Sequence, residues 1–478
     1  MHNSKLIQLM ASLDKAEVVR FLEFVTSPYF NKRKEQVVLA KYLKKYHPDF
    51  PPERFEKDTI FKLLFPVARF DLKRLRYEMS YLTKLLEDFL AIQYFQDNQF
   101  QKGYHLLESL NDKKLDKYFN QTFKKLDSQA AEEKEKNARH YLQLHLLNDL
   151  ADDHFSQKRE RKFDIKIQDA SHFLDLFYLS QKLRYSCNMI DRQKFLAIQY
   201  KIDFQDELHS MLEKVDFEGI EDIEVYDKLF HAIDKEDEEQ YFFEIVDLLK
   251  KNSDHLWKED QKEIFMHLIN YCARKIRRGN EGYVETALEL YLIGIQSKVL
   301  FIEGFLSPWT FKNIISLGLR SKRYEWVKDF INEYGEAIKP QFRRDALNFN
   351  LADLSFHQNE FRETLSYLNM LNYSDIYYTL NGRVLLLKTY FHLEELNPLL
   401  SGIASFTIYL KRNNQITKDV KNSYLNFCNL LFRIVKAKPN KIEQVIERIN
   451  NTEQVISKAW LNSICKSSES LKLKEQVS

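Results

Sequence analysis

One group of residues in the chain has the types and the spacing of a metal site. His145, Asp149 and Asp152 are four and three residues apart, which places an imidazole and two carboxylates on one face of a helix. Metal centres in helical bundles use such faces, but they need matching carboxylates on the facing helices. No Glu-x-x-His pair repeats in the sequence, and Leu144 and Leu147 lie on the opposite face. We therefore interpret the three residues as a solvated helix face, and we expect no metal and no other cofactor.

The motifs of the common enzyme classes are absent from the sequence. It contains no G-x-x-x-x-G-K-[ST] phosphate loop, no G-x-S-x-G elbow, no H-E-x-x-H pair and no EF-hand loop. Gly279 and Gly282 lie close together in RRGNEGY, but no strand precedes them, so we interpret them as a helix stop and a turn. We expect no enzymatic activity; the alternative is an enzyme whose helical active site uses none of these motifs.

The cysteines do not form a metal or redox motif. Cys187, Cys272, Cys428 and Cys465 are separated by 85, 156 and 37 residues, and no C-x-x-C is present. This spacing excludes a zinc ribbon and a thioredoxin-type pair. We expect four reduced thiols that are packed in the interior.

Turn-forming residues are scarce along the whole chain. Ten glycines and nine prolines make up 19 of the 478 residues, and no proline occurs between Pro66 and Pro308. An average protein has roughly 12% of these two residues, about three times the share found here. This scarcity argues against all-β folds and against dinucleotide-binding folds built on glycine-rich loops. Because 44% of the residues are hydrophobic, the chain can still form continuous cores. We predict an all-α protein.

No segment of the sequence has the character of a membrane span or a secretion signal. No run approaches the about 20 consecutive apolar residues that a spanning helix needs. The first residues lack an apolar stretch followed by a cleavage site, because Asp14, Lys15 and Glu17 interrupt it. We expect a cytoplasmic protein that is not inserted in a membrane.

Residues 1–97 are predicted to form an N-terminal helical module. Asp14, Asn31 and Asp71 precede apolar periodic segments and are expected to cap three of its helices. The helix after Asp14 should end before Pro28, and the helix after Asp71 should be long.

The long helix carries a heptad pattern. Its apolar residues alternate three and four apart: Leu72, Leu75, Met79, Leu82, Leu86 and Phe89. Such a seam requires a partner helix. The partner lies either in the same chain or in a second copy, so a homodimer through the Leu72–Phe89 seam is one alternative.

Basic residues line the beginning of the same helix: Arg69, Lys73, Arg74 and Arg76. With the preceding segment DTIFKLLFP they give a loose helix-turn-helix outline. Against it, the connection is longer than the turn of that motif, and residues 51–100 have no net charge. A nucleic-acid-associated regulator that uses this basic stripe is our alternative function.

Residues 98–252 are predicted to form a charged helical middle region. Its segment 201–250 contains 17 acidic and 5 basic residues, whereas residues 401–450 contain 3 and 9. We interpret 221–251 as a solvated acidic helix pair, broken at Asp234; the alternative is an acidic face that docks on a basic surface of this chain or of a partner. The apolar segment from Phe173 to Leu183 should be buried around most of its circumference.

Residues 253–478 show a repeating pattern of helix hairpins. Apolar helices are joined by short polar turns, and an aromatic residue or leucine opens the second helix of each pair: Tyr283, Tyr324, Phe361 and Leu396. These positions are 41, 37 and 35 residues apart, a period that is typical of stacked two-helix units. We predict an α-solenoid that ends in a capping helix with Trp460.

Within this region, the segment LADLSFHQNEFRETLSYL (351–368) resembles a tetratricopeptide repeat. Its matching positions are the large–small pair Leu351-Ala352, the mid-helix aromatic Phe356, the turn Asn359-Glu360 and the following aromatic Phe361. It departs from the family at Thr364, where alanine is preferred, and no proline closes the unit. The resemblance covers at most residues 255–457 and implies a right-handed solenoid of helix pairs.

In a solenoid of this kind, one face of each first helix lines a concave surface. The residues expected there are Trp309, Lys312, Arg320, Phe349, Asp353, His357, Asn381, Lys388 and His392. Mixed aromatic and charged side chains suit an extended peptide, with cations available for acidic groups or a C-terminal carboxylate. The sequence therefore predicts a non-enzymatic scaffold or adaptor that binds a protein or peptide in this groove.

Overall fold

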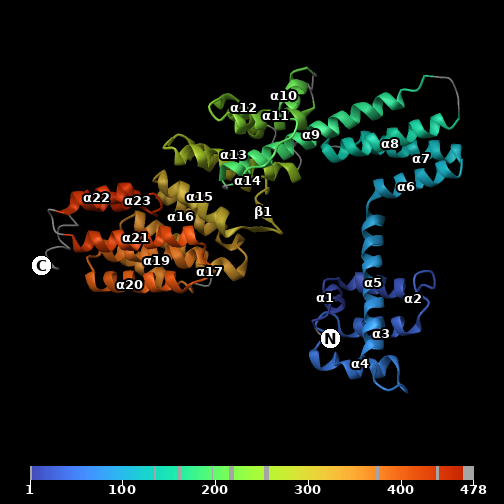
Figure 1. The fold of residues 1–478 in the computed structure, drawn as a ribbon, viewed down its shortest axis with the longest axis horizontal. Coiled ribbons are helices and arrows are strands. Elements are labelled where there is room, and N and C mark those ends of the chain that lie inside the picture. Colours follow the sequence, from blue (N-terminus) through green and yellow to red (C-terminus); the bar gives the residue numbers. More distant parts are fainter. Residues whose placement is uncertain are drawn as a thin grey trace. The chain divides into compact units, whose positions relative to one another are not determined.

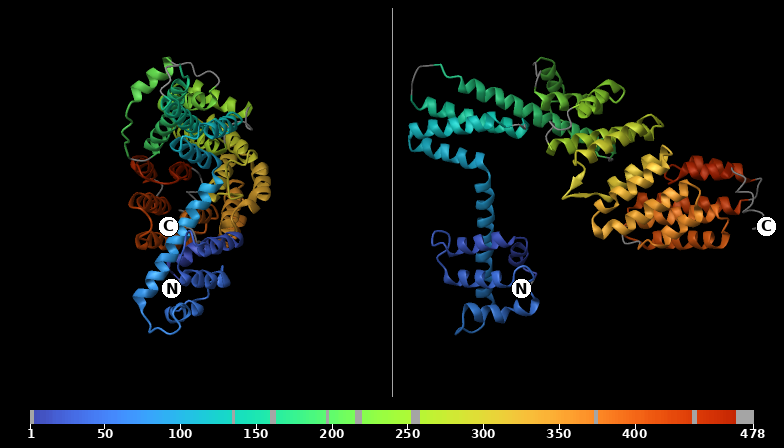
Figure 2. Two further views of the ribbon diagram at one scale, coloured as in Figure 1. Left: turned by 90° about the vertical axis from the view of Figure 1, so that its right-hand side faces the viewer. Right: turned by 180° about the vertical axis from the view of Figure 1, so that it is seen from behind.

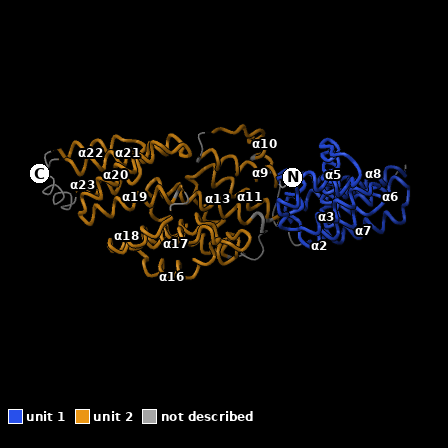
Figure 3. Tube along the Cα trace, turned by 90° about the horizontal axis from the view of Figure 1, so that it is seen from below, with its two compact units in different colours: residues 1–179 blue, residues 180–478 orange. Residues whose placement is uncertain are grey.

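The protein is almost entirely helical. The computed structural model describes residues 3–133, 136–158, 163–195, 198–214, 220–251, 258–372, 376–437 and 441–466. Over these ranges it has 23 α-helices and two short strands, which confirms the all-α prediction (Figure 1; Figure 2). The chain divides into two compact units, 1–179 and 180–478 (Figure 3). The domain limits expected near residues 97 and 252 remain predictions, and residue 252 lies outside the described ranges.

The N-terminal part of the first unit is built around one long helix. Its helices are α1 (Lys5–Ala11), α2 (Lys15–Thr26), α3 (Lys34–Tyr46), α4 (Lys57–Leu64) and α5 (Leu72–Asp97), with a short 3₁₀ turn at Pro52–Arg54. Helices α1 to α4 all pack against α5. Phe21, Leu39, Phe61, Leu82 and Phe89 are almost fully buried between them.

Two of the three predicted helix caps are confirmed. The Asp14 carboxylate accepts a hydrogen bond from the Glu17 N–H at 2.7 Å, and Glu17 accepts one from the Asp14 N–H. Asp71 accepts from the N–H groups of Lys73 and Arg74. Asn31 was predicted wrongly, because α3 begins only at Lys34. Its buried amide instead donates to the Val25 carbonyl in the last turn of α2 at 2.8 Å and to the Arg33 carbonyl at 2.9 Å.

The heptad seam of α5 is covered by its own module. Leu75, Leu82, Leu86 and Phe89 belong to the core formed with α1 to α4. The seam therefore has an intramolecular partner, and the structure does not support the alternative of a homodimer through Leu72–Phe89. The reason is that the same apolar stripe cannot be buried in the module and also face a second chain.

The remainder of the first unit is a helical bundle. It consists of α6 (Gln99–Asp112), α7 (Asp116–Ala131), α8 (Ala138–Ser156) and the beginning of α9 (Lys166–Phe195). The expected burial of the segment from Phe173 to Leu183 around most of its circumference is wrong. Leu176 and Leu183 are buried, but Leu174 is 45% exposed and Tyr178 38% exposed. Only one stripe of this segment faces the core.

The second unit begins with the end of α9 and continues through four further helices. These are α10 (Gln205–Lys214), α11 (Glu221–Asp234), α12 (Glu239–Lys251) and α13 (Lys258–Arg277). The acidic pair α11 and α12 ends at the predicted residues, but it is not purely a solvated face. Asp222 and Glu236 are buried, and Glu239 forms an ion pair with Lys275 of α13 at 2.6 Å. Part of the acidic excess is therefore neutralised inside the unit.

A sequence of packed helices follows. They are α14 (Tyr283–Gln296), α15 (Pro308–Arg320), α16 (Tyr324–Tyr334), α17 (Pro340–His357), α18 (Phe361–Asn369), α19 (Ile376–His392), α20 (Leu396–Arg412), α21 (Lys418–Lys436), α22 (Ile442–Asn451) and α23 (Lys458–Lys466), with a 3₁₀ turn at Gly335–Ala337. The four anchors expected to open second helices are the first residues of α14, α16, α18 and α20. Each even-numbered helix in this set packs against the helix before it, and α17 also packs against α15 and α19. Trp460 lies in the last described helix.

Three of the helix pairs are joined by the same tight turn. Lys322, Asn359 and Glu394 each have a positive φ, between 57° and 65°, and each lies two residues before the second helix. The following N–H closes each turn on the carbonyl five residues earlier, as in the bond from Glu360 to Ser355 at 2.8 Å. This is the backbone pattern of a Schellman cap. Gly279, with φ 94°, ends α13 in a related way, which confirms that it is a helix stop.

A small β-hairpin lies between α14 and α15, and the sequence did not predict it. Strands β1 (Phe301–Ile302) and β2 (Phe305–Leu306) pair antiparallel. Glu303 and Gly304 between them both have positive φ, at 52° and 79°. A two-residue loop of this conformation matches the twist of a hairpin.

No helix in the described part of the chain is both long and apolar enough to cross a membrane. The four cysteines are buried free thiols, as expected for packed residues. Burial raises the pKa of Cys272 and of Cys428 to about 12, so these thiols are not reactive at neutral pH.

Candidate functional site

A row of charged residues crosses three successive first helices of the second unit. Lys312 lies on α15, Asp353 on α17 and Lys388 on α19. Helix α17 packs directly against both neighbours, so the carboxylate lies on the helix between the two lysines. All three side chains are half-buried. We refer to Lys312, Asp353 and Lys388 as the charged row.

The electrostatics of the charged row follow from its partial burial. Burial lowers the pKa of Lys388 to about 8, and the Asp353 carboxylate opposes this effect. Burial also lowers the pKa of Lys312, again against the attraction of Asp353. In both lysines the lost hydration of the ammonium group has a larger effect on the pKa than the attraction of the carboxylate.

A shallow pocket of about 450 Å³ adjoins the charged row. It is lined by Ser316, Leu319, Arg320, Lys322, Tyr324, Asp353 and His357. The structure thus brings three predicted site residues together, from α15 and α17. The His357 ring Nδ1 lies 2.8 Å from the Asp353 carbonyl oxygen and 3.5 Å from its carboxylate, so the two residues form one polar edge of the pocket.

Arg320 has a partner of its own in this pocket wall. Its Nε and Nη2 atoms donate to the two carboxylate oxygens of Glu281 at 2.8 and 2.5 Å. This bidentate pair joins α15 to the turn that precedes α14. Because its charge is neutralised there, Arg320 contributes shape to the pocket more than a cation for a ligand.

Two other predicted groove residues serve in helix packing. Phe349 is 5% exposed, and its ring lies against that of Tyr378 with centroids 5.5 Å apart. Asn381 accepts a hydrogen bond from the Tyr424 hydroxyl at 3.3 Å, which joins α19 to α21. Trp309, at the beginning of α15, is 54% exposed.

His392 lies in an aromatic cluster at the end of α19. Its ring stacks on Phe361, and Trp460 Nε1 donates a hydrogen bond to His392 Nε2 at 3.2 Å. The Trp460 ring also lies 5.4 Å from the Lys388 ammonium, within the range of a cation–π contact. The cluster therefore attaches the last described helix to the charged row.

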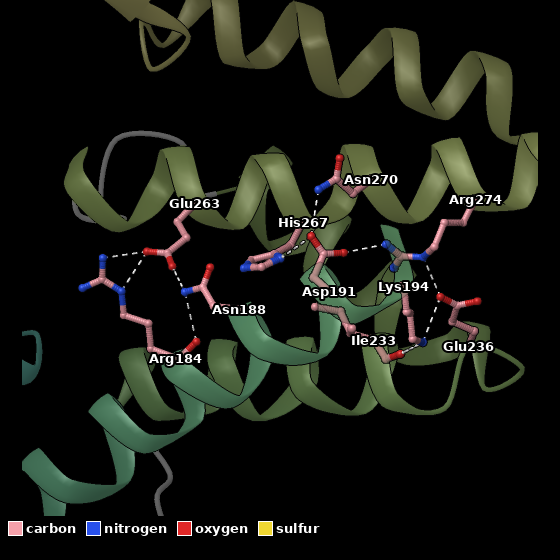
Figure 4. A network of polar contacts seen from close by, with 10 residues as sticks. All are labelled: Arg184, Asn188, Asp191, Lys194, Ile233, Glu236, Glu263, His267, Asn270 and Arg274. Carbon is pink, nitrogen blue, oxygen red and sulfur yellow. Dashed lines mark hydrogen bonds and ion pairs between the residues drawn. The ribbon is translucent and has the colours of Figure 1, made fainter. Parts of the chain in front are cut away.

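A second polar cluster lies inside the same unit, between α9, α13 and the connection from α11 to α12 (Figure 4). Asp191 of α9 accepts hydrogen bonds from Arg274 Nη1 at 2.5 Å and from Asn270 Nδ2 at 2.8 Å. Its other contact is His267 Nδ1 at 3.3 Å. The three partners of Asp191 all come from α13, so this carboxylate fixes α9 to α13.

Glu236 extends the cluster to the α11–α12 connection. It accepts from Arg274 Nε at 2.6 Å and from Lys194 Nζ at 2.9 Å, and Arg278 Nη1 lies 2.8 Å away. The Arg274 guanidinium therefore joins two carboxylates from different elements. At the other end, Arg184 pairs with Glu263 (Figure 4).

Two acidic members of this cluster, Asp191 and Glu236, have pKa values below the ordinary range of carboxyl groups. Burial alone would raise the pKa of Asp191, but His267, Asn270 and Arg274 outweigh it and hold the pKa below its ordinary value. Burial alone would also raise the pKa of Glu236, but Lys194 and Arg274 outweigh it and hold the pKa below its ordinary value. Since each charge has a partner inside the helix interface, we interpret the cluster as a structural link.

Sequence reasoning missed this cluster, although the sequence contains its signal. Arg184, Asn188, Asp191 and Lys194 are spaced four, three and three residues apart. A second set on the other helix is spaced four, three and four apart: Glu263, His267, Asn270 and Arg274. Two polar stripes of complementary charge on successive helical positions indicate helices that face each other.

The other sequence candidates lie in the first unit. His145 is half-buried, and its Nδ1 lies 3.0 Å from the Ala170 carbonyl of α9, so this residue is not on a fully solvated face. Asp149 is exposed and Asp152 half-buried. Among the residues that the structure describes, no group of three or more His, Cys, Asp or Glu could hold a metal ion.

The basic stripe of the N-terminal module is exposed at Arg69, Lys73, Arg74 and Arg76. Arg74 lies over the Phe65 ring at 3.6 Å, and Arg76 borders a largely apolar pocket of about 520 Å³. Residues 65–71 separate α4 from α5, so the connection is longer than the turn of a helix-turn-helix motif. A nucleic-acid role for this stripe stays a prediction.

No protein-family model, no curated protein and no solved structure matches this chain. The geometry of the charged row and its pocket is therefore the basis of the functional argument.

Proposed function

We propose that the protein is a non-enzymatic, cytoplasmic scaffold or adaptor. In this proposal the helix pairs of residues 255–457 form a right-handed solenoid of tetratricopeptide-like units. The face that carries the charged row binds an extended segment of another protein. The proposal does not depend on the first unit.

The observation that carries the proposal is the charged row with its adjoining pocket. Lys312 and Lys388 are half-buried on two first helices that both pack against α17, and burial lowers the pKa of both. The pocket beside the row adds a concavity next to α15 and α17. A binding surface accounts for both features.

Two further observations support the solenoid part of the proposal. The anchors Tyr324, Phe361 and Leu396 begin second helices in register with one another, each two residues after a positive-φ turn residue. In addition, α15, α17 and α19 pack in sequence, as the first helices of stacked pairs do. Repetition of one pair geometry is what produces an extended binding face.

In mechanism, the scaffold would present a rigid surface. Exposed aromatic residues such as Trp309 would anchor the bound segment, and the charged residues around the pocket would select among segments. The helices are already packed, so binding would require little ordering of the scaffold itself.

The test is a purification of the intact protein from its native cells, with and without nuclease treatment. We expect specific protein partners that survive nuclease and that are lost in the variant Lys312→Ala/Lys388→Ala. Lys411→Ala, an exposed change on α20, is the matched control and should retain the partners.

Loss of the partners after nuclease, together with enriched DNA or RNA, would overturn the scaffold proposal. Binding that falls steeply with salt and depends on Arg69, Lys73 and Arg76 would then favour the nucleic-acid alternative.

A further inference from the structure

The N-terminal module contains a pocket that the proposed function does not use. It has a volume of about 520 Å³ and lies between α5, the beginning of α4, the 3₁₀ turn and the residues before α1. Its apolar walls are Pro52, Leu72, Leu75 and Met79. The volume falls within the range of about 300–1,000 Å³ that is typical of small-molecule sites, which are also mostly apolar.

The pocket lies where the heptad seam of α5 is incompletely covered. Farther along the helix, Leu82 and Leu86 are fully buried, whereas Leu72 and Met79 are only half-buried although α1 and α4 pack against α5. Leu72 and Met79 are seven residues apart, so the apolar stripe in the pocket is about 10 Å long. Covering this stripe with an apolar group would be favourable.

Two cations border the apolar stripe. Among the described residues that line the pocket, Lys57 of α4 and Arg76 of α5 are basic and none is acidic. Both side chains are exposed, and neither forms an ion pair or a hydrogen bond within the described part of the chain. The charge of the lining therefore complements an anionic group on a ligand.

A third polar group in the wall is without a partner. Ser4 lines the pocket, and its hydroxyl Oγ is buried and makes no hydrogen bond to any described residue. A buried hydroxyl in this state is destabilising, and an oxygen acceptor on a ligand would satisfy it.

We propose that this pocket binds a carboxylate that carries a medium-length alkyl chain. The chain would lie along Leu72, Leu75 and Met79, and the carboxylate would pair with Arg76 and Lys57. A guanidinium offers two parallel N–H donors that match the two oxygens of a carboxylate. The inference goes beyond the proposed function, because it concerns the first unit and a small ligand.

A second copy of the chain is a poor occupant of this pocket. A symmetric contact brings the same patch of both copies together, so Lys57 and Arg76 would meet cations of their own kind. A small amphipathic anion covers the apolar stripe and pairs with the cations at the same time.

The experiment is isothermal titration calorimetry of the full chain with three carboxylates of increasing length: hexanoate, octanoate and decanoate. Octanol and octylammonium have the same chain as octanoate but a neutral or a cationic head group. We expect one octanoate to bind per chain, with affinity rising about fourfold for each added methylene until the stripe is filled. Octanol and octylammonium should each bind at least about tenfold more weakly than octanoate.

The variants separate the head group from the alkyl chain. Lys57→Gln/Arg76→Gln should weaken octanoate binding at least about tenfold and leave octanol binding unchanged, a difference that damage to the fold would not produce. Leu72→Ser should weaken both ligands, because it shortens the apolar stripe. Lys62→Gln/Lys84→Gln is the matched control, since it removes two exposed lysines of α4 and α5 outside the pocket lining, and it should leave octanoate binding unchanged.

Octanol or octylammonium binding as tightly as octanoate would overturn the carboxylate assignment, as would full octanoate affinity in Lys57→Gln/Arg76→Gln. If none of the five ligands binds, the pocket is not a site for small amphipathic molecules. Either failure leaves the proposed function intact, because that function rests on residues of the second unit.

Discussion

The imidazole of His392 lies parallel to the phenyl ring of Phe361, with ring centroids 4.6 Å apart and an interplanar angle of 3°. Phe361 is the first residue of α18 and His392 the last residue of α19. The Trp460 indole donates to His392 Nε2, and an indole nitrogen can only donate, so Nε2 must be unprotonated. His392 is therefore a neutral packing residue in this arrangement.

The first prediction concerns the bond between Trp460 and His392. Trp460→Phe should destabilise the second unit by about 1 kcal/mol, because it removes one hydrogen bond and retains most of the ring packing. Trp460→Ala should cost about 2–4 kcal/mol, since its contacts with Phe391 and Phe427 are also lost. Thermal unfolding followed by circular dichroism would test this; equal losses in the two variants would show that the hydrogen bond contributes all of the effect.

The second prediction concerns the buried cluster around Arg274. Arg274→Met should lower the free energy of unfolding by about 3–5 kcal/mol, because it leaves Asp191 and Glu236 in the interface without their shared cation. Urea unfolding followed by tryptophan fluorescence is suitable, since all four tryptophans lie in residues 180–478.

The matched control for Arg274 is Arg320→Met. Like Arg274→Met, this change removes a guanidinium that pairs with a carboxylate. The side chains of Arg320 and Glu281, however, are 46% and 62% exposed. Solvent screens such a pair, so we expect a loss of at most about 1 kcal/mol. Similar losses in both variants would contradict the interpretation that burial makes the Arg274 cluster a structural link.

The helix pairs could be predicted from the sequence because their signals are local. Caps such as Asp71 and anchors such as Phe361 act within one turn of helix. The spacing of neighbouring residues in the sequence is therefore enough to predict them. The β-hairpin was missed because four strand residues are too few to show a period of two. The dipeptide Glu303-Gly304 was the remaining feature of the sequence that could have indicated a hairpin turn.

The candidate site was predictable only in part. Arg320, Asp353 and His357 lie around one pocket, whereas Lys388 is not among its lining residues, and the placement of all these residues in one binding groove stays a prediction. Phe349 and Asn381 lie on the expected helices, but the sequence could not reveal that Phe349 packs against Tyr378 and that Asn381 accepts a hydrogen bond from Tyr424. Such partners are set by the rotation of whole helices, which one sequence does not record.

The third prediction concerns the close contact between α15 and α16. A Cβ atom on Gly318 would lie 2.6 Å from Val327 Cγ2 and 3.0 Å from Trp326 Cζ3. Val327 is fully buried and cannot move aside, so Gly318→Ala should destabilise the unit by about 1–3 kcal/mol.

Gly282→Ala is the control for Gly318→Ala. Gly282 already has helical angles, with φ −59° and ψ −26°, and its nearest side-chain atom would be 3.4 Å away. We expect a stabilisation of about 0.4–1 kcal/mol, because alanine restricts the unfolded chain. The urea concentrations at the unfolding midpoints of the two variants would test both predictions. An unchanged midpoint for Gly318→Ala would show that α15 and α16 can move apart without loss of stability.

The fourth prediction is a pH dependence that arises from Lys388. Its pKa is lowered from 10.5 to about 8 in the folded protein, so unfolding takes up a proton between these two pH values. The folded state should therefore gain stability as the pH rises from about 8 to about 10.5, by about 1–2 kcal/mol for a half-buried group. The variant Lys388→Met should lack this gain.

The appropriate measurement is the difference between wild type and Lys388→Met at each pH. Tyrosines and cysteines also titrate in this range, but they contribute equally to both proteins. Parallel stability curves from pH 7 to pH 10.5 would show that Lys388 is as well hydrated in the folded protein as in the unfolded chain.

The turns at Lys322, Asn359 and Glu394 bear on how the second unit can move. Each turn is closed by backbone hydrogen bonds and leaves no residue free to absorb a change of φ and ψ. A hinge needs such residues, so the two helices of a pair must travel together. Motion within α15 to α20 is thereby confined to sliding between pairs, at the contacts of α16 with α17 and of α18 with α19. The face that carries the charged row can therefore change its curvature in steps of one helix pair.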